Sequence, residues 1–311
     1  MNNPQIVEGR IAHYQWEKSA MAVGSFDGMH RGHQYLISTL SRHARQKGLH
    51  SVLFTFHPHP AYVLRPESAP SLLTTLSEKK FLLRRTSLDK AVIYPFSESF
   101  AAMPAKSFLK FLKSRFGLRL LLVGYDHVFG SDRISDPELL KALSDELGIE
   151  TVFGDCYQHK GVIVSSTKIR KLLIEGQIER ANALLGYDYM MEGEVVHGSK
   201  FGRKIGFPTA NLALPDPHKL VPLEGVYVVG VEMPGKKKYN GVLNIGQKPT
   251  INREKTKHIE VHILNFEGDL YGEKLRIRFL KRLRAEQKFS SIEALRKQIE
   301  EDIINAVRLI N

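Results

Sequence analysis

Short apolar runs alternate with amphipathic stretches along residues 1–186, which is the pattern of repeated β-α units. The apolar runs predict strands over residues 20–26, 51–56, 90–94, 118–124 and 162–164. Helices are predicted over residues 34–47, 104–116, 166–174 and 178–185, and a further helix begins at Asp136 and Pro137. We therefore expect this half to form an α/β fold with a parallel sheet.

Beyond Gly186 the apolar positions follow a shorter, alternating period, interrupted by turns rich in Gly, Pro and Lys. Strands are predicted over residues 193–197, 225–231, 239–245, 259–264 and 274–279. One long helix is predicted over residues 291–309, because apolar side chains recur there at spacings of three and four. The second half is therefore expected to be a small antiparallel β-barrel with a long terminal helix.

The length of 311 residues favours two domains, and the change of pattern places their boundary near Gly186, giving domains 1–186 and 187–311. With 42% hydrophobic and 25% charged residues, the composition is that of a globular protein and argues against disorder. The single cysteine, Cys156, cannot form an internal bridge, which fits a reducing compartment. Neither a secretory signal nor an apolar run long enough to span a membrane is seen, so we expect a cytoplasmic protein without a membrane partner.

The formal net charge of +12 indicates an anionic partner: nucleic acid, a membrane surface or a phosphorylated small molecule. Residues 1–186 carry 24 basic and 17 acidic side chains, a balance of +7, which leaves 21 and 16, a balance of +5, for the remainder. Because the charge is spread and not gathered in a tail or stripe, a nucleic-acid partner is the weaker expectation. Oligomeric state does not follow from the sequence.

Residues 23–33, VGSFDGMHRGH, run from a predicted strand through a glycine-rich turn into a helix. Glycines allow the backbone to approach a ligand closely, and the free N–H groups of a helix N-terminus attract phosphate. His30 and His33 flank Gly32, so both imidazoles can face one anion. This is the spacing of the HxGH motif of nucleotidyltransferases, in which histidines stabilise charge during phosphate transfer. A metal-binding pair or two surface histidines are the alternatives.

Three more segments of the first half follow strands or begin a helix. Residues 54–60, FTFHPHP, and 124–130, GYDHVFG, should meet at one crevice beyond the carboxyl ends of their strands. Their aromatic side chains can stack on a flat ring or lie in the core. Residues 165–170, SSTKIR, offer hydroxyls, backbone donors and a guanidinium to triphosphate oxygens, although Ser and Thr also cap helices without any ligand.

In the second half, residues 198–211, GSKFGRKIGFPTAN, combine glycines, cations and a Thr and Asn two positions apart. Thr209 and Asn211 could hold hydrated Mg²⁺ beside a nucleotide. Glu260 lies in HIEVH, where strand alternation places it on one face with His258 and His262. It is a candidate general base for a substrate hydroxyl, or alternatively a solvated strand carboxylate.

Together these motifs resemble the bacterial bifunctional riboflavin kinase/FMN adenylyltransferases, the prokaryotic FAD synthetases. The matching segments are GSFDGMHRGHQ, FTFHPHP, GYDHVFG, SSTKIR, GRKIGFPTANL, LNIGQKPTI, EVHIL, DLYGEKL and LRAEQKF. The resemblance implies that a Rossmann-like nucleotidyltransferase domain adenylylates FMN to FAD, and that a C-terminal six-stranded barrel phosphorylates riboflavin to FMN. ATP and Mg²⁺ would be required, with the flavins as substrates and products.

The resemblance also implies roles for single residues. In the first domain, the residues implied to bind ATP are Gly24, Phe26, Asp27, His30, His33, Asp126, Ser166, Thr167 and Arg170. In the second, they are Gly198, Gly202, Arg203, Thr209 and Asn211, of which Thr209 and Asn211 would also hold the metal. The residues implied to contact flavin are Phe56, Pro58, His127, Phe129 and Arg284. Glu260, His30 and His33 would be catalytic.

Two positions depart from the family pattern. The family usually has an acidic residue where this chain has His57, and commonly an aromatic residue where it has His127. Both lie in the predicted adenylyltransferase half, so a protein with only one active module, or with an altered flavin preference, is a second hypothesis. A flavin-sensing, RNA-binding regulator is a third, suggested by the net charge of +12.

Overall fold

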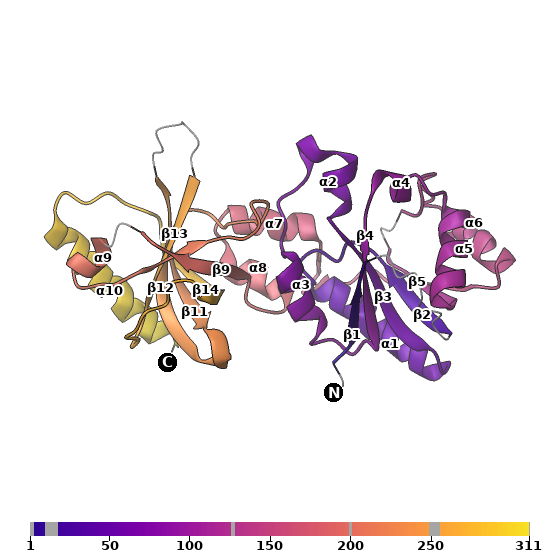
Figure 1. Cartoon of the computed structure of the whole chain (residues 1–311), viewed down its shortest axis with the longest axis horizontal. Helices are drawn as coiled ribbons and strands as arrows, with labels where there is room; N and C mark the ends of the chain where they lie inside the picture. Colours follow the sequence, from indigo (N-terminus) through magenta and orange to yellow (C-terminus); the bar gives the residue numbers. More distant parts are fainter. Residues whose placement is uncertain (1–2, 10–17, 126–127, 199–200, 249–255, 311) are drawn as a thin grey trace. The chain divides into compact units, whose positions relative to one another are not determined.

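A computed structural model of the chain describes residues 3–9, 18–125, 128–198, 201–248 and 256–310 (Figure 1). The chain divides into two compact units. The sheet unit comprises Met1–Leu72 and Lys79–Ser165, and the barrel unit comprises Leu73–Glu78 and Ser166–Asn311.

The sheet unit is built on a parallel sheet of six strands in the order β1-β4-β3-β2-β5-β6. The strands are β1 (Gln5–Glu8), β2 (Ser19–Val23), β3 (His50–His57), β4 (Lys90–Pro95), β5 (Leu118–Val123) and β6 (Glu150–Phe153). The predicted parallel sheet is confirmed, but β1 and β6 were not predicted. The strand predicted over 162–164 is instead the short β8 (Val162–Ile163), which pairs only with β7 (Gln158–His159).

Helices cover both faces of this sheet, because successive strand residues point to opposite sides. Met21 and Val23 of β2 join a core with Phe108 and Leu112 of α5, whereas α1 packs on β2 and β3 through another set of buried side chains. The helices are α1 (Arg31–Gln46), α2 (Pro60–Leu64), α3 (Leu76–Leu83), α4 (Glu98–Ala101), α5 (Ala105–Phe116) and α6 (Pro137–Glu146), with a 3₁₀ turn at Pro66–Ser68. The first residues of α3 belong to the barrel unit.

The barrel unit contains a closed antiparallel barrel in the strand order β10-β13-β12-β11-β14-β9, which confirms the predicted fold class. Its strands are β9 (Met190–Val196), β10 (Ala210–Ala213), β11 (Gly225–Glu232), β12 (Lys238–Lys248), β13 (Thr256–Ile263) and β14 (Lys274–Arg284). Its helices are α7 (Ser166–Ile174), α8 (Ile178–Leu185), α9 (Phe201–Lys204) and the long α10 (Ile292–Ile310), with a 3₁₀ turn at Pro234–Lys236 (Figure 1). Contacts thus group α7 and α8 with the barrel, so that the sheet unit ends at Ser165 and not at the expected Gly186.

A buried ion pair fixes the segment Leu73–Glu78 inside the barrel unit. The Lys219 ammonium donates to a Glu78 carboxylate oxygen at 2.6 Å and to the Leu73 carbonyl at 2.6 Å, and it lies over the Tyr189 ring. The Glu78 carboxylate also accepts hydrogen bonds from the backbone N–H groups of Thr75 and Glu192. Both charged side chains are almost fully buried, so each depends on its partner for compensation.

Candidate active sites

The three phosphate or flavin motifs predicted in the first half follow three adjacent strands. The HxGH turn follows β2, the FTFHPHP segment ends β3, and the GYDHVFG segment follows β5, which borders β2 on the other side. The connections run from β2 to β3 and β4 in one direction and from β5 to β6 in the other, so the order reverses beside β2. A reversal of this kind is where open α/β sheets bind ligands, which supports the expected crevice.

The turn after β2 has an unusual backbone. Phe26 and Met29 have φ values of 47° and 40°, in the left-handed region that non-glycine residues rarely adopt, and Gly28 has a φ of 82°. Such a conformation persists only where its surroundings hold it, and it is common at ligand sites. Asp27, between these residues, is 2% exposed.

His30 and His33 form a stacked pair at the start of α1. Their ring centroids are 3.6 Å apart, and the His30 Nδ1 caps the helix by accepting a hydrogen bond from the backbone N–H of His33. A Cβ on Gly32 would lie 3.2 Å from the His30 ring, so glycine allows the ring to fold back onto the helix. The two imidazoles therefore lie side by side, and their binding of one anion stays a prediction.

The electrostatics of His33 suit an anion. Burial, followed by the neighbouring His30 and Lys79, lowers the pKa of His33 well below its usual value. Its Nδ1 atom is buried and has no hydrogen-bond partner among the described residues. A phosphate oxygen would satisfy this nitrogen and would reverse the electrostatic cost of protonating the ring.

Lys79 of α3 also belongs to this site, although the sequence motifs do not include it. Its ammonium donates to the Ser25 carbonyl at 2.8 Å and attracts the Asp27 carboxylate. No motif pointed to it, because Lys79 is the middle of three consecutive charged residues, Glu78 to Lys80, and such a run usually lies on a solvated helix face.

The predicted flavin contacts of this half are only partly supported. Phe129 is 1% exposed and lies on Phe108 with a centroid distance of 5.3 Å, and Phe56 is 8% exposed among Phe54, Phe96 and Phe100. Both are core residues in this structure, because their side chains are buried and pack against other aromatic rings.

The other ligand contacts predicted for the first half are exposed, lie outside the described residues, or belong to the barrel unit. Pro58 is exposed at the end of β3 and remains available to a ligand. Asp126 and His127 lie outside the described residues. Ser166, Thr167 and Arg170 begin α7 as predicted, but α7 belongs to the barrel unit, so their place in the adenylyltransferase site stays a prediction.

In the barrel unit, two glycines make room for the two predicted metal ligands. A Cβ on Gly198 would lie 2.2 Å from the Asn211 amide nitrogen, and one on Gly202 would lie 2.4 Å from the Phe207 carbonyl and 3.2 Å from the Thr209 hydroxyl. Gly198 therefore leaves room for the Asn211 side chain, and Gly202 leaves room for the Phe207 carbonyl and the Thr209 hydroxyl. This explains in physical terms why glycines recur beside Thr209 and Asn211.

Glu260 joins this cluster from the neighbouring strand. It stands opposite Asn211 in the β10–β13 pairing, and the Thr209 hydroxyl lies 3.5 Å from its carboxylate. The carboxylate also contacts the His258 imidazole. Ile259, Val261 and Ile263 are buried and alternate with Glu260, so Glu260 lies on the opposite, outer face of β13. Alternation had predicted that it shares a face with His258 and His262, but not which face.

Thr209 lies in the wall between two cavities. One cavity, of about 290 Å³, is lined by Arg203, Thr209 and the segment from Phe266 to Tyr271. The other, of about 260 Å³, is lined by Thr209, Glu260 and Arg284, together with apolar side chains that include Leu295 and Ile299 of α10. The sequence motifs had not indicated two separate cavities. Two cavities that share Thr209 could hold two substrates close to each other.

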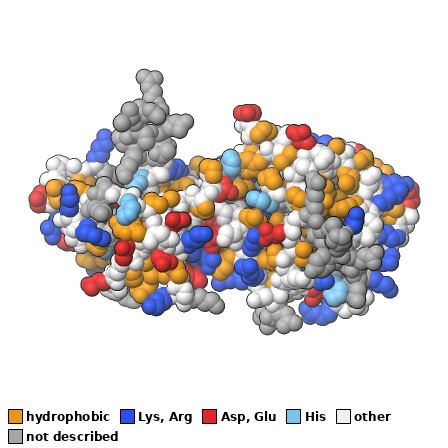
Figure 2. Space-filling model, in the orientation of Figure 1, with side chains coloured by type: hydrophobic (Ala, Val, Ile, Leu, Met, Phe, Trp, Pro, Cys, Tyr) orange, Lys and Arg blue, Asp and Glu red, His pale blue; other side chains and the backbone are white. Residues whose placement is uncertain are grey.

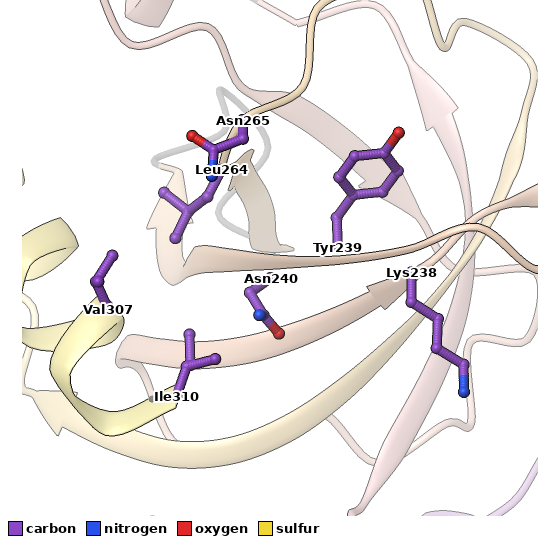
Figure 3. Close-up of a pocket in the computed structure, with 7 residues that line it drawn as sticks. All are labelled: Lys238, Tyr239, Asn240, Leu264, Asn265, Val307 and Ile310. Carbon is purple, nitrogen blue, oxygen red and sulfur yellow. The ribbon is translucent and has the colours of Figure 1, made fainter.

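A further cavity, of about 270 Å³, lies at the beginning of β12 (Figure 3). The residues that line it are Lys238, Tyr239, Asn240, Leu264, Asn265, Val307 and Ile310. It has one basic side chain and no carboxylate, so it lacks a group that could act as a general base.

Two family models match the chain: "FAD synthetase" over residues 12–168 and "Riboflavin kinase" over residues 185–310. A bifunctional riboflavin kinase/FMN adenylyltransferase of Bacillus subtilis is 39% identical over 298 residues, covering 94% of this chain and 92% of the relative. The protein of the same name from Buchnera aphidicola subsp. Schizaphis graminum is 37% identical, covering 92% of each chain. The chain belongs to the bifunctional riboflavin kinase/FMN adenylyltransferase family.

The two family models divide the described sites between them. The FAD synthetase part contains the His30–His33 pair and ends within the first turn of α7, so Ser166 and Thr167 lie inside it and Arg170 lies beyond it. The riboflavin kinase part contains the glycine-backed Thr209 and Asn211, Glu260 and both of the adjoining cavities.

Similarity to a solved structure extends over nearly the whole chain. A crystal structure described as a macrolide-efflux protein from Streptococcus pneumoniae matches with a TM-score of 0.86 and 32% identity, covering 96% of this chain and 97% of that one. Among the described residues of the present family member, no helix is long and apolar enough to cross a membrane.

Proposed function

We propose that this protein makes FAD in two steps, phosphorylating riboflavin to FMN in the barrel unit and adenylylating FMN with the HxGH site of the sheet unit. The observation that carries the kinase assignment is the position of Thr209 between two cavities, within reach of Glu260. A phosphate donor bound in one cavity and an acceptor bound in the other would both lie next to Thr209, so the phosphoryl group would move only a short distance.

In the kinase step, riboflavin occupies the cavity beside Arg284 and α10, whose apolar lining suits the flavin ring. ATP occupies the cavity beside Arg203, and Gly198 and Gly202 leave room for the Asn211 and Thr209 side chains that would hold its phosphates through the metal. Glu260 takes the proton from the ribityl 5′-hydroxyl as that oxygen attacks the γ-phosphorus. The bond from the γ-phosphorus to the bridging oxygen breaks, and ADP leaves.

The residues near Glu260 fit Mg²⁺. The Asn211 Oδ1 atom is buried with no hydrogen-bond partner in the described part of the chain, and the Thr209 hydroxyl and the Glu260 carboxylate add oxygen atoms, which are the donors that this ion prefers. Thr209 and Asn211 would hold the ion together with ATP. When bound, the ion neutralises negative charge on the phosphates.

In the adenylyltransferase step, an FMN phosphate oxygen attacks the α-phosphorus of ATP. The bond from that phosphorus to the β-phosphate oxygen breaks, and pyrophosphate leaves. His30 and His33 stabilise the developing charge, and the turn from Gly24 to Asp27 shapes the nucleotide site. The further ATP contacts proposed are Asp126, Ser166, Thr167 and Arg170, and the flavin contacts proposed are Pro58 and His127.

The site chemistry calls for small-molecule partners, and we place the reaction in the cytoplasm without a membrane or nucleic-acid partner. On the face shown in Figure 2, basic and acidic side chains are interspersed over both units. Phosphate binding at two sites accounts for part of the surplus positive charge.

The test is turnover measured separately for the two products. Incubation with riboflavin, ATP and Mg²⁺ should yield FMN and then FAD, and FMN supplied in place of riboflavin should yield FAD and pyrophosphate. If neither product forms with oxidised or with reduced flavin, the proposed function is wrong. FMN without FAD would favour the hypothesis of one silent module, which the unusual His57 and His127 suggest. Salt-dependent RNA binding without turnover would favour the regulator instead.

A further inference from the structure

Lys79 is a buried cation beside the HxGH turn. Lys79 is 6% exposed, and its ammonium donates to the Ser25 carbonyl at 2.8 Å. The Thr55 hydroxyl of β3 donates to the same carbonyl at 3.0 Å. Two donors from separate elements therefore converge on one backbone oxygen of the turn.

The position of this carbonyl decides what Lys79 can do. Ser25 directly precedes Phe26, the first of the two non-glycine residues with a positive φ, and the turn leads to His30, which caps α1. A backbone of this kind needs external contacts to hold it. The Lys79 ammonium supplies one contact on the carbonyl and a second, electrostatic one on the Asp27 carboxylate.

We propose that Lys79 is a positioning residue for adenylyl transfer: it fixes the turn from Gly24 to Met29 and thereby sets the stacked His30–His33 pair against the phosphates of ATP. The inference rests on the proposed adenylyltransferase function. Lys79 acts through the turn and need not touch the substrate.

The charge of Lys79 gives the inference a measurable consequence. Burial lowers the pKa of Lys79 to about 8, and the Asp27 carboxylate partly opposes this effect. The other charged or titratable groups near it are His33, stacked on His30, and the adjacent Glu78, whose carboxylate is paired with Lys219. As the pH rises through about 8, the ammonium becomes a neutral amine, its attraction to Asp27 is lost, and the turn is held less firmly.

The experiment compares the full-length protein with Lys79→Met, Lys79→Arg and the control Lys80→Met, assaying FAD formation from FMN between pH 6.5 and 9.5. Lys80 is the next residue of α3, but its ammonium pairs with Glu8, at the far edge of the sheet from β2. We expect Lys79→Met to lower kcat/KM for ATP about 10- to 100-fold near neutral pH, with the KM for FMN unchanged. FMN formation from riboflavin by the same preparations reports on folding of the barrel unit, and denaturant unfolding of each variant reports on folding of the sheet unit.

The pH profile separates positioning by charge from a merely structural role. The unsubstituted protein should lose FAD synthesis above pH 8, whereas Lys79→Arg should retain it, because a guanidinium stays protonated throughout this range. The inference is overturned if Lys79→Met matches Lys80→Met, or if Lys79→Arg keeps the same alkaline loss. If Lys79→Met fails to fold, the pH profiles of Lys79→Arg and the unsubstituted protein still test the inference. Failure of the unsubstituted protein to form FAD would instead overturn the proposed function.

Discussion

The guanidinium of Arg284, at the end of β14, donates two parallel hydrogen bonds to the carboxylate of Asp302 on α10. The Nε–Oδ1 distance is 3.0 Å, the Nη2–Oδ2 distance is 2.7 Å, and Asp302 is 3% exposed. Both residues line the cavity proposed for riboflavin. Arg284 was predicted to contact flavin, which stays a prediction. Its pairing with Asp302 gives it a second role, to orient α10 against the cavity, because two of its guanidinium nitrogens are already engaged.

Replacing Asp302 by Asn should loosen this helix. The change removes one charge of a mostly buried pair and leaves Arg284 uncompensated, so the free energy of unfolding should fall by about 3 kcal/mol, measured by denaturant unfolding. The KM for riboflavin should rise about tenfold, because the cavity wall is less well ordered. The neighbouring, exposed Glu301→Gln serves as control. Equal KM values for the two variants would contradict the assigned role.

Glu260→Gln should abolish the kinase step. The carboxamide keeps the shape of the side chain but cannot accept the proton of the ribityl hydroxyl, so FMN formation should fall about 10²- to 10⁴-fold. FAD formation from supplied FMN should be unaffected. Glu194→Gln, on the exposed face of β9, is the matched control. A kinase rate within a factor of two of the unsubstituted protein would remove Glu260 from its role.

Gly198→Ala should weaken metal binding at the kinase site. The new methyl group would lie 2.2 Å from the Asn211 amide nitrogen, so that side chain must move. We expect FMN formation to require a higher Mg²⁺ concentration, measured by titrating the metal at saturating ATP. In Gly230→Ala the new methyl group meets mainly the flexible end of Arg278, and the Mg²⁺ requirement should not change. Identical Mg²⁺ curves for both variants would argue against Asn211 as a ligand.

ATP should raise the pKa of His33. In the free protein the lowered pKa keeps this imidazole neutral at pH 7, and the negative charge of the triphosphate reverses the unfavourable electrostatics. Imidazole NMR titrations with and without ATP measure the change, with His30→Ala as a comparison. If the His33 titration is the same with saturating ATP, the triphosphate does not lie at the histidine pair.

The same pKa has a consequence for stability. Because the folded pKa of His33 lies below the unfolded value of about 6.5, the unfolded chain binds more protons as the pH falls from 7. The contribution of His33 to the free energy of unfolding therefore decreases from pH 7 down to its lowered pKa. A His33→Gln variant should lose less stability than the unsubstituted protein across this window, measured by denaturant unfolding at each pH.

The Lys219–Glu78 pair should show strong coupling. Lys219→Met leaves a buried carboxylate without its cation, and Glu78→Gln leaves a buried ammonium without its anion, so each should cost about 3 to 5 kcal/mol of unfolding free energy. The double variant should cost less than the sum, because neither charge then remains. Additive costs in the double-mutant cycle would show that the pair is not coupled.

Much of the architecture follows from periodicity alone. The alternation of apolar runs predicted the central strands β2 to β5 and most of the barrel, and the HxGH spacing placed two histidines in one site. The edge strands β1 and β6 are short and half-exposed, so their sequences carry little apolar signal. Strand β10 is equally short and begins at the last two residues of the glycine-rich motif, so its sequence does not stand out as a strand.

Side-chain roles were harder to predict, because they depend on contacts between distant segments. Phe129 looked like a ligand contact from its motif, but packing against Phe108 makes it a core residue. Lys79 and Asp302 carry no motif, and they acquire their roles only when the fold brings them to Ser25 and Arg284. Neither burial nor pairing of a charge can be predicted from local spacing.

The position of the segment Leu73–Glu78 in the sequence affects how the two units could be produced as separate proteins. Its residues are encoded within the first half of the gene, yet they supply the counter-charge that Lys219 needs inside the barrel unit. A gene divided at the junction of the two family models would leave this peptide on the wrong product. Engineering a free-standing kinase from this chain therefore calls for an apolar replacement at Lys219 as well as a new first codon.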